Sequence, residues 1–112
     1  AYHSSSGNLA YSYMPYLPDA GASCGMNFVN SGSAGFFDGF SIVGGHEYAE
    51  AITDPQPNTG WLDSRSSEIG DKCAWLAPGT PGGATDLSTG GQSYAVQSLW
   101  SNAAGGCVTS TR

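Results

Sequence analysis

The segment 44–50 contains a histidine and two glutamates at spacings that suit metal chemistry: His46, Glu47 and Glu50. Residues i and i+4 of a helix lie on one face about one turn apart, so His46 and Glu50 would point at the same ion. Glu47, rotated by about 100° from His46, would stand beside that ion and accept a proton from an activated water. The sequence therefore predicts a metal-dependent hydrolase, with His46 and Glu50 as ligands and Glu47 as the catalytic base.

The carboxylates of the chain are concentrated around this segment. Seven of the nine acidic residues lie between residues 38 and 71, where Arg65 is the only basic residue, with Lys72 directly after them. Like charges at this density repel unless they are solvated, share protons or bind cations. A catalytic zinc site takes three protein ligands and keeps one position open. Glu68 and Asp71 are the candidates for the third ligand, and zinc is the expected ion, with manganese or calcium as alternatives.

The run 46–54 resembles the active-site helix of the thermolysin-like peptidases, the gluzincin group, which reads H-E-x-x-H-x-x-T-D. In that family the third ligand is a glutamate some two dozen residues downstream, followed by an aspartate that orients a histidine ligand. Glu68 and Asp71 lie at a similar distance from His46. Two departures stand out: Glu50 replaces the second histidine, and the spacing from Glu68 to Asp71 is one residue shorter than the family's. The resemblance implies a zincin-like fold and peptide-bond hydrolysis.

A second resemblance covers residues 36–107. Secreted bacterial proteins of little-characterised function carry H-E-x-x-E, T-D-P, G-W-x-D and E-x-G-D-x-C in this order, which here are residues 46–50, 53–55, 60–63 and 68–73. The plant EXORDIUM secreted proteins look like distant members of the same group. This likeness implies a shared site more than a named activity.

Composition restricts the class of protein. The 112 residues suffice for one small domain, but 17 glycines leave few large aliphatic side chains for a core. The net charge of -6 argues against nucleic acid and anionic membrane surfaces as partners. No apolar run approaches the ~20 residues of a membrane span. We expect a loop-rich α+β domain with short strands, one central active-site helix and disulfides.

The cysteines point to a secreted, processed chain. Cys24, Cys73 and Cys107 make an odd number, which leaves one thiol free or paired with another chain. Cys73 and Cys107 are expected to be disulfide members, although their partners are left open. We expect residues 1–112 to be the C-terminal part of a metallopeptidase precursor, disulfide-linked to or packed against its N-terminal chain. A complete small domain with one buried thiol is the alternative.

The active-site helix is predicted at 41–53, capped by Asp38 or Ser41 and ended before Pro55. The predicted packing stripe of this helix consists of Ile42, Gly45, Ala49 and Ile52. The pair Gly44–Gly45 would allow another segment to approach the helix closely.

Strands and loops are predicted on either side of the helix. Residues 9–17 and 94–100 have strand character, 94–100 with a short helix as alternative, and 78–91 reads as an irregular loop. Trp61, Trp75 and Trp100 are expected in the core. His3 is expected to be exposed or locally hydrogen-bonded, with a place in the site as the alternative. Asp54, Asp63 and, as an alternative to its role as a ligand, Asp71 would cap turns or bind structural calcium.

The function predicted from these observations is a secreted zinc-dependent endopeptidase that acts on peptide or protein substrates. Two alternatives stay open. One is a non-catalytic, calcium-stabilised extracellular binding domain. The other is a metal-independent acid peptidase that uses its carboxylates directly, which the sequence pI of about 4.3 permits.

Overall fold

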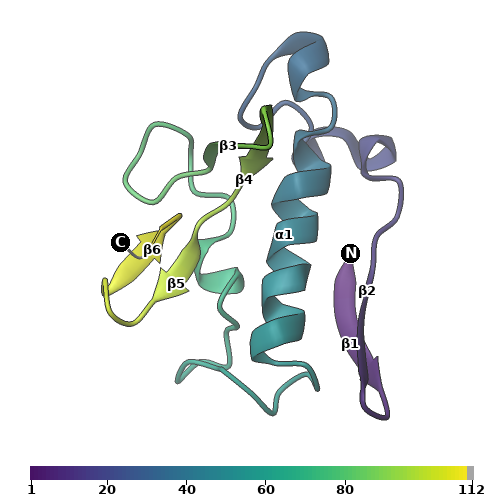
Figure 1. Ribbon diagram of the computed structural model, residues 1–112, viewed down its shortest axis with the longest axis vertical. Helices are drawn as coiled ribbons and strands as arrows, with labels where there is room; N and C mark the ends of the chain where they lie inside the picture. The colour runs from purple at the N-terminus through teal and green to yellow at the C-terminus, as the bar shows by residue number, and fades with distance from the viewer. Residues whose placement is uncertain (111–112) are drawn as a thin grey trace.

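The computed structural model describes residues 1–110 and shows an α+β chain built around one helix, α1 (Asp38–Thr53) (Figure 1). Within this range, six short strands form three separate antiparallel hairpins: β1 (Tyr2–Ser6) with β2 (Leu9–Tyr13), β3 (Thr85–Thr89) with β4 (Gln92–Val96), and β5 (Leu99–Ser101) with β6 (Gly106–Val108). Three 3-10 segments connect them: η1 (Leu17–Cys24), η2 (Gly32–Gly35) and η3 (Asp71–Cys73). The expected α+β class with short strands is confirmed.

The hairpins gain support from the helix. A two-stranded hairpin is marginal by itself in water. Strands β1, β2 and β4 all contact α1, and Figure 1 shows the β1–β2 hairpin on one side of the helix and the β5–β6 hairpin across from it. In β1 the register pairs His3 with Ser12, and His3 is the buried residue of that strand. The first hairpin thus delivers a histidine to the surface of α1.

Helix α1 begins three residues earlier than predicted and ends at Thr53 as predicted. Neither Asp38 nor Ser41 caps it, so that prediction is wrong: the N-cap residue is Phe37, without a side-chain cap bond. The Asp38 carboxylate instead accepts the N–H groups of Val29 and Asn30 at 2.9 and 2.7 Å. Asp38 is therefore occupied in tying the preceding loop to the helix.

The predicted packing stripe of α1 is also wrong in part. Ile42 is buried at 1% exposure, but Ile52 is 62% exposed, and a Cβ added to Gly45 would meet nothing within 4 Å. The inward face carries Glu47 and Glu50, both buried. Close approach occurs six residues earlier, at Gly39, where a Cβ would lie 2.0 Å from the Cys24 carbonyl oxygen. The helix consequently turns its acidic side chains, more than its aliphatic ones, toward the interior.

The apolar core is small. Its buried hydrophobic residues are Leu17, Ile42, Cys73, Ala84 and Ala95. The expectation of a tryptophan core is wrong for Trp75, which is 45% exposed, while Trp61 and Trp100 are half-buried.

A disulfide compensates for this small core. Cys73 and Cys107 form the bond, which joins η3 to β6, and both are confirmed as disulfide members. Within residues 1–110, Cys24 is unpaired. None of the helices in this range is long and apolar enough to cross a membrane.

The predicted strand 9–17 is confirmed only as far as Tyr13. The predicted irregular loop 78–91 contains β3, and 94–100 contributes to β4 and β5 as strand.

Candidate metal centre

His46, Glu50 and Asp71 come together at the inner face of α1. His46 Nε2 lies 3.1 Å from Glu50 Oε1 and 3.5 Å from Asp71 Oδ1, and the three ligand atoms fall within 4.8 Å of one another. Ligands about 2.1 Å from a tetrahedral zinc ion lie about 3.4 Å apart. The separations therefore suit one ion held by three of the residues that the sequence singled out.

The orientation of His46 is fixed from behind by Gln97. The Gln97 side-chain amide donates to the carbonyl oxygens of Gly70 and Ser98 at 2.9 and 3.0 Å, which turns its Oε1 toward His46 Nδ1 at 3.1 Å. Because that oxygen can only accept, Nδ1 carries a proton and Nε2 is the nitrogen that faces the carboxylates. Metal-binding histidines have this kind of supporting partner. Sequence reasoning missed Gln97, which lies 51 residues from His46.

Backbone groups hold Glu50 in place. Glu50 Oε1 accepts the N–H groups of Gly70 and Asp71 at 3.1 and 3.2 Å, and the residue is 2% exposed. A Cβ on Gly70 would lie 2.8 Å from His46 Nδ1 and 2.9 Å from Glu50 Oε1. A glycine at this position therefore permits the 70–71 loop to lie directly against the two helix residues.

Asp71 serves two purposes. Its Oδ2 accepts the Glu68 N–H at 3.1 Å, which closes the turn that leads into η3, while Oδ1 faces His46. The side chain is 48% exposed, so this corner of the ligand set is open to solvent.

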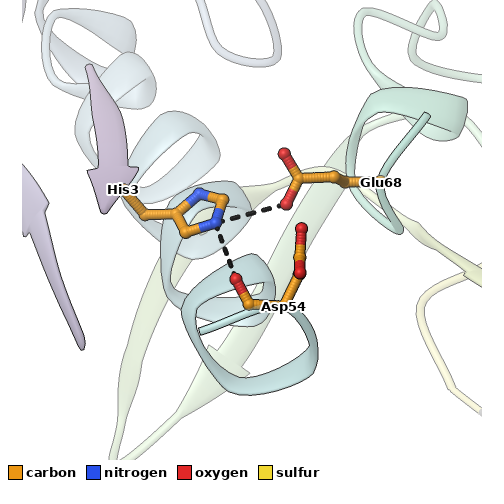
Figure 2. A group of neighbouring side chains, drawn as sticks. All are labelled: His3, Asp54 and Glu68. Atoms are coloured by element: carbon orange, nitrogen blue, oxygen red, sulfur yellow. Dashed lines mark hydrogen bonds and ion pairs between the residues drawn. The ribbon is translucent and has the colours of Figure 1, made fainter. Parts of the chain in front are cut away.

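Glu68, the other candidate for the third ligand, lies in a different group. Figure 2 shows it facing His3 and Asp54, with its Oε2 3.2 Å from His3 Nε2. That oxygen is buried and has no hydrogen-bond partner within the described part of the chain. Burial and then the charge of Glu50 raise the pKa of Glu68 to about 7.

Asp54 closes the turn after the helix. Its carboxylate accepts the backbone N–H groups of Asn58, Thr59 and Gly60. Burial by itself would raise its pKa, but these bonds outweigh burial and lower it. The prediction that Asp54 caps a turn is confirmed. Asp63 does the same for its own turn, accepting the N–H groups of Arg65 and Ser67.

The expectation of an exposed or locally hydrogen-bonded His3 is wrong, and the residue instead lies beside Glu47 and Glu50, as the alternative had it. It is 8% exposed, not a solvated terminal residue. Its Nδ1 lies 3.3 Å from Glu47 Oε2, and its Nε2 lies 3.1 Å from the Asp54 carbonyl oxygen. Burial lowers the pKa of His3, but the charge of Glu68 and the other acceptors outweigh burial and raise it. No local sequence pattern indicates this placement, because the contacts of His3 join residues 44 and 51 positions apart.

Burial and charge compete at His46 too. Burial would lower the pKa of His46, but the hydrogen bond and the charge of Glu50 outweigh it and raise the pKa to about 9. Without a cation, protons therefore neutralise part of the negative charge.

A cleft with a volume of about 200 Å³ opens beside His46 and Glu47. Its other walls are Ala1, Cys24, Val43, Ala74, Trp75 and Gln97. The predicted base and a predicted ligand thus border one space, and the partly exposed Trp75 provides an apolar wall for it.

No protein-family model, curated protein or solved structure matches this chain. The function is therefore argued from the site itself.

Proposed function

We propose that this chain carries the catalytic centre of a secreted zinc-dependent endopeptidase of zincin-like fold. The observation that supports the proposal is the set of His46, Glu50 and Asp71, with a histidine oriented by Gln97 and a cleft alongside. One imidazole with two carboxylates is a ligand set that zinc accepts. Calcium, which takes oxygen ligands, is the poorer match for a site with a histidine.

Each residue of the site would have a separate role in peptide hydrolysis. A bound zinc ion would supply Lewis acidity for water and for the scissile carbonyl. Glu47 accepts the proton of the attacking water and returns it to the leaving amine. When protonated at Nδ1, His3 holds Glu47 in position through its 3.3 Å contact with Oε2. The cleft accommodates the substrate chain against Trp75.

Secretion is part of the proposal. The Cys73–Cys107 disulfide is of the kind that forms in oxidising compartments. The unpaired Cys24 borders the cleft, where a second chain of the same precursor would find a thiol to pair with.

Elemental analysis together with a peptidase assay tests the proposal. The purified protein should contain zinc, lose activity with a chelator, and regain it when zinc is restored. Glu47→Gln should keep the zinc held by His46, Glu50 and Asp71 and lose the activity, because an amide cannot accept the proton. Asp19→Asn, which changes an exposed carboxylate outside the cluster, is the matched control and should keep both properties.

One observation favours a metal-free alternative. The pKa of Glu68 is raised to about 7 while that of the neighbouring Asp54 is lowered, which is how acid–base pairs of carboxyl groups arise. An acid peptidase of this kind would be insensitive to chelators and would lose activity in Glu68→Gln. Calcium in place of zinc, with function unaffected by Glu47→Gln, would instead indicate the non-catalytic binding domain.

A further inference from the structure

Glu50 presents one carboxylate oxygen to each of two histidines. Its Oε1 lies 3.1 Å from His46 Nε2, and its Oε2 lies 3.6 Å from His3 Nδ1. Glu47 Oε2 lies 3.3 Å from the same His3 nitrogen. His3, Glu47 and Glu50 therefore form a second three-residue set, with ligand atoms within 4.8 Å and all three residues buried.

The ring of His3 is arranged as a ligand. Its Nε2 lies 3.1 Å from the carbonyl oxygen of Asp54, which can only accept a hydrogen bond, so Nε2 carries the proton. Nδ1 is left as the nitrogen that faces Glu47 and Glu50. A histidine bound to metal through one nitrogen typically donates the other N–H to a backbone carbonyl or a carboxylate. Gln97 does the same for His46, so the two sets are built alike.

Charge gives a second, independent argument. Five carboxylates surround the two histidines: Glu47, Glu50, Asp54, Glu68 and Asp71. Among residues 1–110 the one ion pair made by a lysine or arginine is Lys72 with Asp63, outside this cluster. With neutral imidazoles the cluster carries a formal charge of −5, which one divalent cation reduces to −3 and a second to −1. The buried Glu68 Oε2, which has no hydrogen-bond partner in residues 1–110, lies 3.2 Å from His3 Nε2, so carboxylates face both nitrogens of this ring.

We propose that His3, Glu47 and Glu50 form a second divalent-cation site, which shares Glu50 with the His46–Glu50–Asp71 centre. A carboxylate has two oxygens and enough lone pairs to serve one ion on each side. Zinc suits both sets because each combines an imidazole with two carboxylates.

The second ion would regulate the centre. This consequence rests on the proposed function, since it assumes that Glu47 is the base. A Glu47 oxygen that binds a cation cannot at the same time accept a proton from water. Occupation of the second site therefore switches the base off, and peptide hydrolysis should rise with the first zinc ion and fall with the second.

Zinc stoichiometry tests the second site without relying on activity. Chelator-treated protein is dialysed to equilibrium against a rising series of zinc concentrations, and bound zinc is counted by mass spectrometry. The wild-type chain should bind two ions, and His3→Gln and His46→Gln should each bind one. Asp19→Asn, the exposed control, should bind two. Circular dichroism checks that each variant is folded, and Glu47→Gln replaces His3→Gln if the latter unfolds.

The outcomes separate this proposal from the proposed function. One ion in the wild type, unaffected by His3→Gln and lost in His46→Gln, overturns the second site and leaves the endopeptidase centre standing. Two ions in folded His3→Gln overturn the assignment to His3. No zinc in any variant contradicts both proposals.

Discussion

Replacing Gly70 by alanine should damage the metal centre without damaging the fold. The added Cβ would lie 2.8 Å from His46 Nδ1 and 2.9 Å from Glu50 Oε1, whereas ordinary contacts begin at 3.4 Å, so the ligands must move by about 0.6 Å. Disturbing the supporting contacts of a metal ligand typically costs about 10–100-fold in affinity. The backbone of Gly70 (φ -80°, ψ -38°) is one that alanine adopts readily, so the substitution causes no backbone strain.

The assay is zinc affinity by competition with a chromophoric chelator, alongside thermal unfolding of the metal-free protein. We expect Gly70→Ala to bind zinc about 10–100-fold more weakly. Gly45→Ala is the matched control, because its Cβ would meet nothing and the residue lies within α1. It should bind zinc normally and gain about 0.5–1 kcal/mol of stability. Wild-type zinc affinity in folded Gly70→Ala would refute the placement of His46 and Glu50 as ligands.

Four further predictions concern Gln97, the disulfide and the raised pKa of His46. Gln97→Ala should weaken metal binding by about 10–100-fold, because His46 Nδ1 loses its acceptor. Titration with cobalt in place of zinc, followed by its visible absorption, measures the affinity. An unchanged affinity would contradict the role of Gln97. Cys107→Ser should lower the free energy of unfolding by about 2–5 kcal/mol in urea titrations, because the disulfide with Cys73 spans 34 residues of sequence. An unchanged urea midpoint would contradict a stabilising role for the disulfide. The pKa of His46 is about 9 in the metal-free chain, so zinc competes with one proton and its affinity should rise about tenfold per pH unit up to about pH 9. The same raised pKa stabilises the metal-free fold fully below pH 6.5, and that contribution should disappear as the pH rises through about 9. Isothermal titration in buffers of different ionisation enthalpy would show proton release, and pH-independent affinity would contradict this pairing.

Local sequence patterns predicted the helix and the proximity of His46 to Glu50 because both depend on short spacings. His46 and Glu50 lie on one face as the four-residue separation requires, and Pro55 ends the helix where expected. The sequence narrowed the third candidate metal ligand to Glu68 or Asp71, and the structure places Asp71 Oδ1 3.5 Å from His46 Nε2. Spacing could not decide between these two, because the choice depends on how the 68–71 turn folds back onto α1.

Long-range contacts account for what the sequence did not predict. His3 reaches the cluster only because β1 lies along α1, and Gln97 only because the chain returns after β4. The packing stripe of α1 was misassigned because hydrophobic periodicity assumes that apolar side chains face inward. Here the buried positions include Glu47 and Glu50, which leaves Ile52 exposed.

A diffraction experiment at the zinc absorption edge would show whether an ion binds between His46, Glu50 and Asp71. Crystals soaked in zinc should give an anomalous peak in contact with His46 Nε2 and with the carboxylates of Glu50 and Asp71. A zinc-saturated crystal with no peak at these three residues, or with its zinc bound only elsewhere on the surface, would contradict the account.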